Sequence, residues 1–527
     1  MSLDTPFQTA KVLAIGILTI LPLLNPLATA LSIPPRQAAA EQQPVIAIKL
    51  SPSLARRDAS TSFTGASLVE SLFLKALPPS LASGTQKRQQ EPLRVLPLFN
   101  LAPEVIDKVV RDAEANDPTY QAPDFKAWFQ VQLPALPEPE SNSQVQVNSI
   151  LKTLAGFPEV ATVQPLGTSA APPQQHRQQP RAATVQPNDD PQFANQAYLK
   201  SSDRGINAEY AWGFPGGDGA GQRVIDVEAG WKLEHEDLIA ANITLLSGVN
   251  NRGRGFGDWR HGTAVLGIML MTDNSIGGVG AAPAAKGDVV SVRRGDIPTD
   301  NNPAGILDAT SRLSAGDVLL LEMQVSNDAG DQYWPVELYD AEFEAIRAAT
   351  AKGIIVIEPA GNGIRGEGEG TGDVDLDSPV VRPGETEARQ WLNPASADYR
   401  GDSGAIMVGA SRSTVPRTKT VWSNYGSRVD VHAWGENITT SRCVDDGAGN
   451  CVDTYEQFDG TSGASPIIVG AVLSAQGMLT ANGRPKLNSV QMRELIKIGG
   501  TPTTDPQNGN IGVMPDLKAL IDGGHLN

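Results

Sequence analysis

Residues 460–466 read Gly-Thr-Ser-Gly-Ala-Ser-Pro and open an apolar, helix-like stretch that continues to Met478. Ser462 stands between small residues, so a peptide carbonyl can come within bonding distance of its hydroxyl, as a nucleophilic serine requires. Two short segments precede it in the chain: Asp226 lies in one apolar run, and His261 opens another. An acid, an imidazole and a hydroxyl in this order are typical of a Ser-His-Asp catalytic triad.

Apolar runs and helix-like patterns alternate from residue 188 onward. Such alternation is typical of a parallel sheet that is covered by helices on both faces. The sequence therefore predicts an α/β fold, with three layers and a mostly parallel sheet, for residues 188–527. Strands are predicted at residues 223–227, 318–323, 354–358 and 405–410, and an amphipathic helix at residues 339–352, which Gly353 ends.

The three candidate residues are expected at one edge of this sheet. In open parallel sheets, ligands bind beyond the carboxyl ends of the strands. Asp226 is predicted at a strand end, whereas His261 and Ser462 immediately precede predicted helices at residues 262–271 and 463–478. A helix N-terminus favours the oxyanion that forms when a carbonyl is attacked. We therefore expect acyl transfer, with Ser462 as nucleophile, His261 as general base and Asp226 orienting the imidazole.

A further segment extends this pattern, and the whole resembles one family. Residues 359–363, Pro-Ala-Gly-Asn-Gly, follow a predicted strand directly, so the Asn362 amide should reach the same edge. Together with the order of Asp226, His261 and Ser462, this segment resembles the subtilisin family (S8) of serine peptidases. The resemblance runs from about Asn188 to the C-terminus. It implies hydrolysis of protein or peptide substrates through an acyl-enzyme on Ser462, with Asn362 as an oxyanion donor and no cofactor for the chemistry.

Two segments depart from the family pattern. The family usually places Ser or Thr and then Gly after its acid, but here Asp226 is followed by Val227 and Glu228. Glu228 either perturbs His261 or faces solvent, as most glutamates do. The segment that pairs with substrate, usually Ser-Leu-Gly, reads Glu-Met-Gln from Glu322 onward. These departures leave two alternatives open: a catalytically silent subtilisin-like binding or scaffold module, and a narrow peptidase that processes only itself.

The N-terminal third is predicted to hold three regions. Residues 1–30 contain an apolar stretch from residue 12 that ends in Ala-Thr-Ala, which is typical of a signal peptide, the alternative being a membrane anchor. Residues 167–187, rich in Ala, Pro and Gln, are predicted to be an exposed linker. Between them, residues 31–166 are expected to form a small α+β domain, with strands near 45–50, 129–133 and 160–163 and helices near 103–116 and 145–154. Its position resembles that of the propeptides that inhibit the family's enzymes intramolecularly.

Location and partners follow from the same features. Cleavage of residues 1–30 would give a secreted or extracellular protein, with a periplasmic or cell-surface location as alternatives, and membrane association is expected only if that segment is retained. The net charge of −17 argues against a nucleic-acid partner, which needs a clustered basic face. Cys443 and Cys451, the only two cysteines, are expected to form a local disulfide in an oxidising compartment, the alternative being two reduced thiols.

The remaining candidate ligands are interpreted as structural. Asp373, Asp375 and Asp377 alternate as calcium ligands do, but no Gly or terminal Glu stands at EF-hand spacing, so a solvated loop is favoured. Structural calcium stays open, because many members of the resembled family bind it. His235 follows the candidate acid closely, and we interpret it as a structural residue rather than as a base or a metal ligand.

Overall fold

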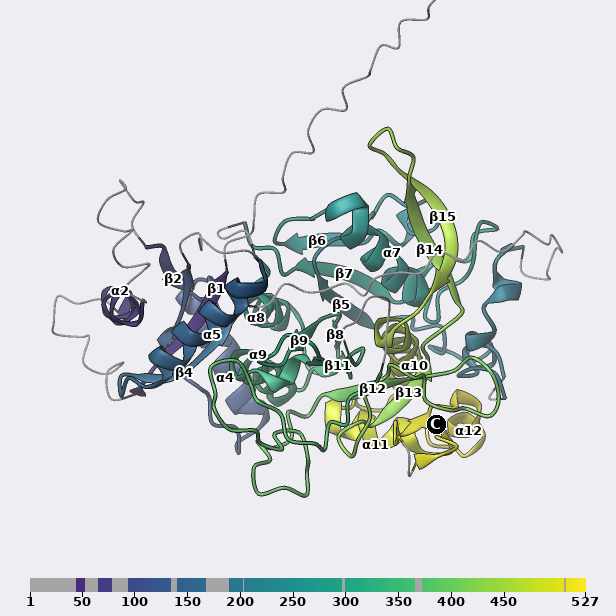
Figure 1. Ribbon diagram of the computed structural model, residues 1–527. Helices are drawn as coiled ribbons and strands as arrows, with labels where there is room; N and C mark the ends of the chain where they lie inside the picture. Colours follow the sequence, from purple (N-terminus) through teal and green to yellow (C-terminus); the bar gives the residue numbers. More distant parts are fainter. Residues whose placement is uncertain are drawn as a thin grey trace, which may run out of the picture. The chain divides into compact units, whose positions relative to one another are not determined.

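The computed structural model describes residues 44–52, 65–77, 93–133, 140–166, 189–201, 203–295, 299–364, 372–506 and 509–527 (Figure 1). Within it, Gln42–Asn527 forms one compact unit, and the following description concerns that unit. The predicted signal peptide or anchor of residues 1–30 and the predicted linker of residues 167–187 lie outside the described residues.

The segment before residue 167 forms a four-stranded antiparallel sheet in the order β2-β3-β1-β4. The predicted helix at residues 103–116 is confirmed, because Pro103 supplies the fixed φ of a first helical turn and Ile106, Val109 and Ala113 share the buried face. The three predicted strands are also confirmed. The elements are β1 (Val45–Leu50), α2 (Gly65–Ala76), β2 (Val95–Pro97), α4 (Pro103–Asn116), β3 (Trp128–Gln132), α5 (Glu140–Ala155) and β4 (Val160–Pro165).

The larger part of the chain contains a nine-stranded sheet in the order β16-β17-β13-β12-β11-β8-β5-β7-β6. Every neighbouring pair is parallel except β16 and β17, so the prediction of a mostly parallel sheet is confirmed. The strands are β5 (Arg223–Glu228), β6 (Thr244–Ser247), β7 (Lys286–Ser291), β8 (Val318–Leu321), β11 (Ile355–Pro359), β12 (Ile406–Ser411), β13 (Val431–Trp434), β16 (Thr501–Pro502) and β17 (Val513–Met514).

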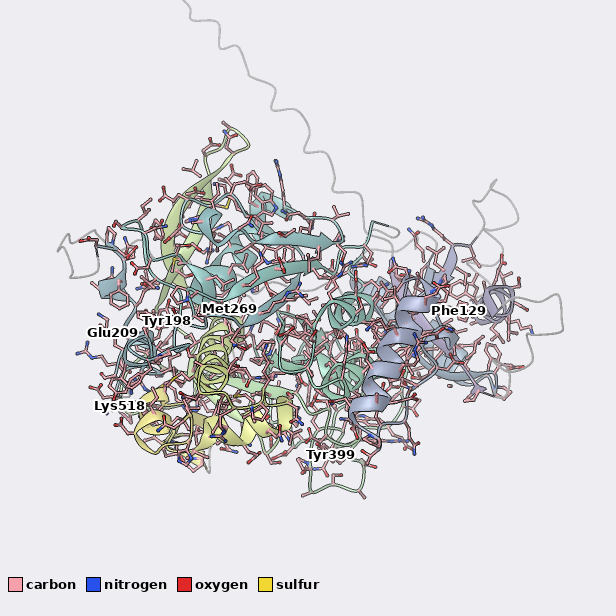
Figure 2. The ribbon with its side chains drawn as sticks, turned by 180° about the vertical axis from the view of Figure 1, so that it is seen from behind. Phe129, Tyr198, Glu209, Met269, Tyr399 and Lys518 are labelled. Atoms are coloured by element: carbon pink, nitrogen blue, oxygen red, sulfur yellow. A yellow bond between two sulfur atoms is a disulfide. The ribbon has the colours of Figure 1, made fainter. Side chains whose placement is uncertain are left out.

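Helices cover both faces of this sheet (Figure 1). Side chains alternate across each strand, so Val224 packs with helices α7 and α10, whereas Ile225 and Val227 pack with α8 and α9. Figure 2 shows the side chains from the opposite side. Met269 of α7, which is labelled there, is fully buried in the core that the sheet forms with α7 and α10. The helices are α6 (Ala208–Ala211), α7 (Gly257–Leu270), α8 (Asn302–Arg312), α9 (Asp340–Ala351), α10 (Thr461–Ala481), α11 (Ser489–Lys497) and α12 (Leu517–Asp522).

Helix α10 crosses the interior of the fold. Among the described residues it is the one helix long and apolar enough to span a membrane, and 89% of its apolar stretch is buried within the molecule. It is apolar on all sides because it packs against α7 and the central strands at once. We therefore read it as a core helix, and its N-terminal end carries Ser462.

A disulfide-linked hairpin packs on α7. Strands β14 (Ile438–Asp445) and β15 (Cys451–Phe458) pair antiparallel, and the structure joins Cys443 to Cys451. Thr440 Oγ1 donates to the Ala264 carbonyl at 2.8 Å. A Cβ at Gly267 would lie 2.4 Å from that same hydroxyl, so only glycine permits this approach. The remaining two strands, β9 (Gln324–Ser326) and β10 (Tyr333–Pro335), form a small separate sheet.

Two predicted boundaries near the site are wrong. Helix α7 begins at Gly257, so His261 lies in its second turn instead of just before it. Phe256 adopts a left-handed conformation with φ 60° that starts the helix there, a local geometry that the glycine-rich sequence hides. Strand β5 runs to Glu228, so Asp226 lies two residues before its end. This second shift brings Glu228 into the sheet and hence into the site.

Candidate active site

Ser462 is the second residue of α10, where backbone N–H groups have no partner within the helix. The turn into the helix requires glycine, because Gly460 has φ 102°. Gly463 is required for space, since a Cβ there would lie 2.5 Å from Ile438. The Ser462 side chain is therefore held at a helix N-terminus, in the positive potential that favours an oxyanion.

Asn362 lies beside this helix start, as the sequence predicts. Its Oδ1 accepts hydrogen bonds from the backbone N–H of Thr461 at 2.9 Å and from the Thr461 hydroxyl at 2.8 Å. Because Oδ1 is occupied in this way, the Nδ2 hydrogens are the part of the amide left to donate. The backbone N–H of Asn362 donates in turn to Gln324 Oε1 at 3.1 Å, and this bond links the loop after β11 to the segment after β8.

His261 is buried between α7, the end of β5 and the hairpin. Its Nδ1 lies 2.8 Å from Glu228 Oε2, and its ring meets Phe458 edge-on with centroids 5.3 Å apart. Its Nε2 has no hydrogen-bond partner among the described residues. Burial lowers the pKa of His261 to about 4 against the opposing effect of the neighbouring acids, and the nearby Arg442 guanidinium lowers it further. The imidazole is therefore neutral at pH 7 and can accept a proton at Nε2.

This burial gives a testable pH dependence. A general base works only when neutral, so activity should be lost as the pH falls through the pKa of His261. We expect the acid limb of kcat/KM for the free enzyme near pH 4, below the ordinary value of 6.5. Initial rates from about pH 3 to pH 8, with the fold monitored by circular dichroism, measure this limb. An acid limb at the ordinary value in a folded protein would contradict the buried imidazole.

Asp226, the acid that the sequence predicts for His261, has a different hydrogen-bond partner. Its Oδ2 accepts from the indole N–H of Trp231 at 2.7 Å, and the structure bonds His261 Nδ1 to Glu228 instead. Trp231 can reach it because Gly262 has no side chain: a Cβ there would lie 2.4 Å from the indole. Asp226 and Glu228 share one face of β5, and Glu228 is the nearer of the two to the strand end that His261 contacts.

The sequence interpretation left Glu228 as a solvent-facing side chain or a perturbing neighbour, and the first of these is wrong. Glu228 is only 3% exposed and bonds the imidazole directly. The signal in the sequence was the spacing of the two acids, because side chains two residues apart in a strand point the same way.

Glu322, which the sequence places in the substrate-pairing segment, is a third buried carboxyl of the site. It directly follows β8, is 4% exposed, and its carboxyl lies beside the Ser462 side chain. Burial raises its pKa well above the ordinary value, and the neighbouring Glu228 and Asp226 carboxyls raise it further. The neutral form of Glu322 is therefore favoured, which keeps a fixed negative charge away from the Ser462 side chain.

The other candidate residues lie away from this constellation. His235 accepts from the Asp237 N–H at its Nδ1 and lies 3.2 Å from the Thr454 carbonyl at its Nε2, contacts of a structural side chain. Asp373 pairs with Lys419, and Asp377 accepts from Ser427. Among the described residues, no group of three or more His, Cys, Asp or Glu side chains could hold a metal ion.

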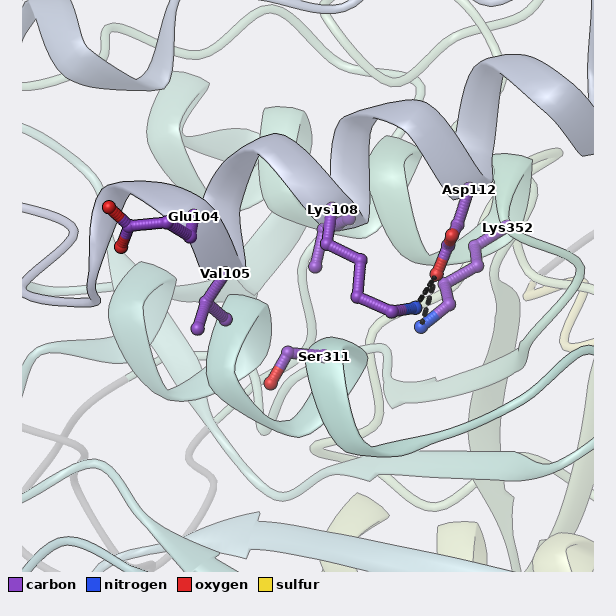
Figure 3. Close-up of a pocket in the computed structure, with 7 residues that line it drawn as sticks. Glu104, Val105, Lys108, Asp112, Ser311 and Lys352 are labelled. Atoms are coloured by element: carbon purple, nitrogen blue, oxygen red, sulfur yellow. Dashed lines mark hydrogen bonds and ion pairs between the residues drawn. The ribbon is translucent and has the colours of Figure 1, made fainter.

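A separate cavity lies between α4 and helices α8 and α9 (Figure 3). It measures about 330 Å³, and Lys108 and Lys352 both pair with Asp112 on its wall. None of the residues that line it belongs to the Ser462 constellation. Its charged groups neutralise one another, so we attach no catalytic role to this cavity.

Known proteins match this chain over its larger part. Residues 249–503 match the family model Peptidase_S8, described as the subtilase family. Alkaline elastase YaB of Bacillus sp. (strain YaB) is 25% identical over 280 residues, which are 53% of this chain and 59% of that protein. The intracellular serine protease of Paenibacillus polymyxa is 27% identical over 298 residues, covering 54% of this chain and 77% of that protein.

A solved structure matches over most of both chains. The epidermin leader peptide processing serine protease of Staphylococcus aureus has 14% sequence identity and a TM-score of 0.50, covering 92% of this chain and 99% of that one. At this identity the likeness shows the fold alone. The family match includes His261, Asn362 and Ser462 and begins after β5, so it leaves out Asp226 and Glu228. Residues 249–503 of this chain are therefore similar to the subtilase family, and its fold is like that of a solved serine protease.

Proposed function

We propose that this chain is a serine endopeptidase that hydrolyses peptide bonds through an acyl-enzyme on Ser462. The observation that carries the proposal is the start of α10, where Ser462 lies next to Thr461, the residue that fixes the Asn362 amide. A neutral imidazole with a free Nε2 and a carboxylate on Nδ1 lies on the same face of the sheet. A hydroxyl, a neutral imidazole and a carboxylate are the groups that acyl transfer by a catalytic triad requires.

The proposed reaction proceeds in two halves. Ser462 Oγ attacks the substrate carbonyl carbon while its proton passes to His261 Nε2. The resulting oxyanion accepts hydrogen bonds from Asn362 Nδ2 and from the Ser462 backbone N–H. His261 then gives its proton to the leaving amine as the C–N bond breaks, and water hydrolyses the ester by the reverse sequence.

Removal of the Asn362 amide should affect the transition state and not substrate binding. We expect Asn362→Ala to lower kcat by about 10²–10³-fold with little change in KM, which is the effect of losing one oxyanion donor. Asn362→Asp keeps an oxygen that accepts from Thr461 but lacks the N–H donor, so its kcat should fall at least as far as that of Asn362→Ala. Steady-state kinetics on a peptide amide measures both. Wild-type kcat in the Asp variant would show that anchoring Thr461 is the whole role of Asn362.

A fluorophosphonate probe tests the proposed function directly. We expect the probe to label the wild-type protein covalently on Ser462, as located by mass spectrometry of the labelled peptide, and we expect the protein to digest casein. A folded protein that neither takes the label nor cleaves casein would favour the silent binding module. Labelling with cleavage of its own chain alone would favour the self-processing peptidase.

The chain before residue 167 is proposed to act as an intramolecular inhibitor. Its support is a set of contacts with helix α9 and the residues around it. Lys49 pairs with Glu344, the indole N–H of Trp128 donates to Glu344 at 2.9 Å, and Gln164 donates to Glu342 at 2.6 Å. Apolar side chains of both parts also share one buried cluster, so this segment packs firmly against α8 and α9.

Export is the remaining part of the proposal. The apolar stretch of residues 12–30 with its Ala-Thr-Ala end supports it, and so does the disulfide, which persists in oxidising compartments. N-terminal sequencing of the protein recovered outside the cell tests export and processing together. A start at residue 1 would contradict cleavage, and a start between residues 167 and 190 would support removal of the inhibitory segment.

A further inference from the structure

Three carboxyl groups face the same side of the central sheet. Strands β5 and β8 are parallel neighbours, with Val227 opposite Leu321. Asp226 and Glu228 flank Val227 and therefore share a face, and Glu322, which donates its N–H to the Val227 carbonyl, follows at the same level. This face also receives α7 and α10, the helices that carry the catalytic base and nucleophile of the proposed function.

The hydrogen bonds of the two β5 carboxyls are divided between different partners. Glu228 Oε2 lies 2.8 Å from His261 Nδ1, and Asp226 Oδ2 accepts from Trp231 at 2.7 Å. The other oxygen of each carboxyl, Asp226 Oδ1 and Glu228 Oε1, is buried without a donor among the described residues. Buried carboxyl oxygens without a donor are costly, so a group that satisfies both at once is expected.

A proton held between the two carboxyls would satisfy both oxygens. Asp226 and Glu228 lie two residues apart on one face of β5, so one proton can be shared by their unpartnered oxygens. Burial raises the pKa of both carboxyls, which favours a proton at this pair. Glu228 is the acid that lies 2.8 Å from His261 Nδ1, so we place the negative charge on Glu228 and the shared proton on Asp226.

We propose that Glu228, and not Asp226, is the positioning acid of His261, and that Asp226 is a neutral carboxyl that donates its proton in a hydrogen bond to Glu228. The proposal rests on the proposed function, whose triad it completes. Glu228 fixes the imidazole tautomer with hydrogen on Nδ1, which leaves Nε2 free for the Ser462 proton. When that proton arrives, the imidazolium is stabilised by the Glu228 carboxylate, and no proton leaves Nδ1.

Two isosteric variants separate the roles of the acids. The amide of Glu228→Gln can donate to Nδ1 and so stabilise the tautomer with hydrogen on Nε2, which cannot accept the Ser462 proton. We expect kcat to fall by about 10³–10⁴-fold with KM nearly unchanged, as when a triad aspartate is replaced by its amide. Asp226→Asn imitates the neutral acid: its amide still donates to Glu228 and still accepts from Trp231. The kcat of Asp226→Asn should therefore fall by at most about tenfold, which is the effect of weakening one hydrogen bond.

A spectroscopic readout separates positioning from mere structural support. The Nδ1 proton of an imidazole bonded to a carboxylate resonates far downfield in one-dimensional proton NMR. We expect this resonance in the wild type and in Asp226→Asn, and its loss in Glu228→Gln. Glu228→Asp, which keeps the charge, should recover part of the kcat lost in Glu228→Gln. If the amide variant fails to fold, Glu228→Ala, which also lacks the carboxylate, replaces it in both assays.

The outcomes distinguish the proposal from its alternatives. A larger loss of kcat in Asp226→Asn than in Glu228→Gln, with the resonance kept in the latter, would overturn the proposal and assign the acid role to Asp226. A wild-type protein that shows the resonance but neither labels nor cleaves would contradict the proposed function and still support the Glu228 contact. Absence of the resonance in an active wild-type protein would overturn the contact itself.

Discussion

Ser462→Ala should lower kcat by about 10⁶-fold, the size of the loss found when the nucleophile of subtilisin is removed. In the proposed mechanism the Ser462 oxygen forms the acyl-enzyme bond, and alanine leaves no atom in that place to attack the carbonyl. The helix start and Asn362 remain, so a rate about 10³–10⁴-fold above that of water should persist. Initial rates of casein hydrolysis at saturating substrate, together with the loss of fluorophosphonate labelling, measure the effect.

Ser465→Ala is the matched control for that variant. Ser465 lies in the same helix, is equally buried, and its hydroxyl donates to the Thr461 carbonyl at 2.9 Å, a bond within the helix. Such back-bonding serine hydroxyls contribute little to helix stability, so kcat should change by no more than about twofold. If Ser462→Ala kept casein hydrolysis within about tenfold of the wild type, an acyl-enzyme on this residue would be excluded.

The central sheet could be predicted from sequence because its middle strands are buried on both faces. A strand covered on both faces is a continuous apolar run, as in β8, β11 and β12, and each of these begins within one residue of its predicted start. The edge strands β16 and β17 are two residues long and leave no such pattern. Their pairing depends on contacts between distant parts of the chain, which no local pattern records.

The sequence indicates which candidate residues meet at this edge of the sheet, but not which hydrogen bonds they form. Ser462 and Asn362 stand in short glycine-rich motifs whose backbone geometry is local, so sequence alone places them at the sheet edge. The acid is different, because Asp226 and Glu228 occupy the same face of β5 and either could reach an imidazole from α7. Which acid contacts the imidazole depends on Trp231. Its indole packs against Gly262 and donates its N–H to the Asp226 carboxyl.

The buried carboxyls near this site are difficult to predict from residue type alone. Glutamates are rarely buried, so Glu228 could be interpreted as a surface residue. Buried carboxyls are tolerated when they can be neutral or can pair: burial raises the pKa of Glu322, and Glu228 bonds the imidazole. Recognising them from sequence would require the register of β5 against β8, which only the folded sheet provides.

His261→Ala should match Ser462→Ala, with kcat about 10⁶-fold below the wild type, because a serine hydroxyl without a base to take its proton is a weak nucleophile. The two residues act as one unit, so the double variant should be no slower than either single variant. His235→Gln is the control: His235 contacts Thr454 and Asp237 away from Ser462, so the folded variant should keep kcat within about threefold and lose only stability. These rates need single-turnover measurements under one set of conditions. Losses that multiply in the double variant would mean that His261 and Ser462 serve separate steps, which would contradict proton transfer between them, since a shared transfer can be lost only once.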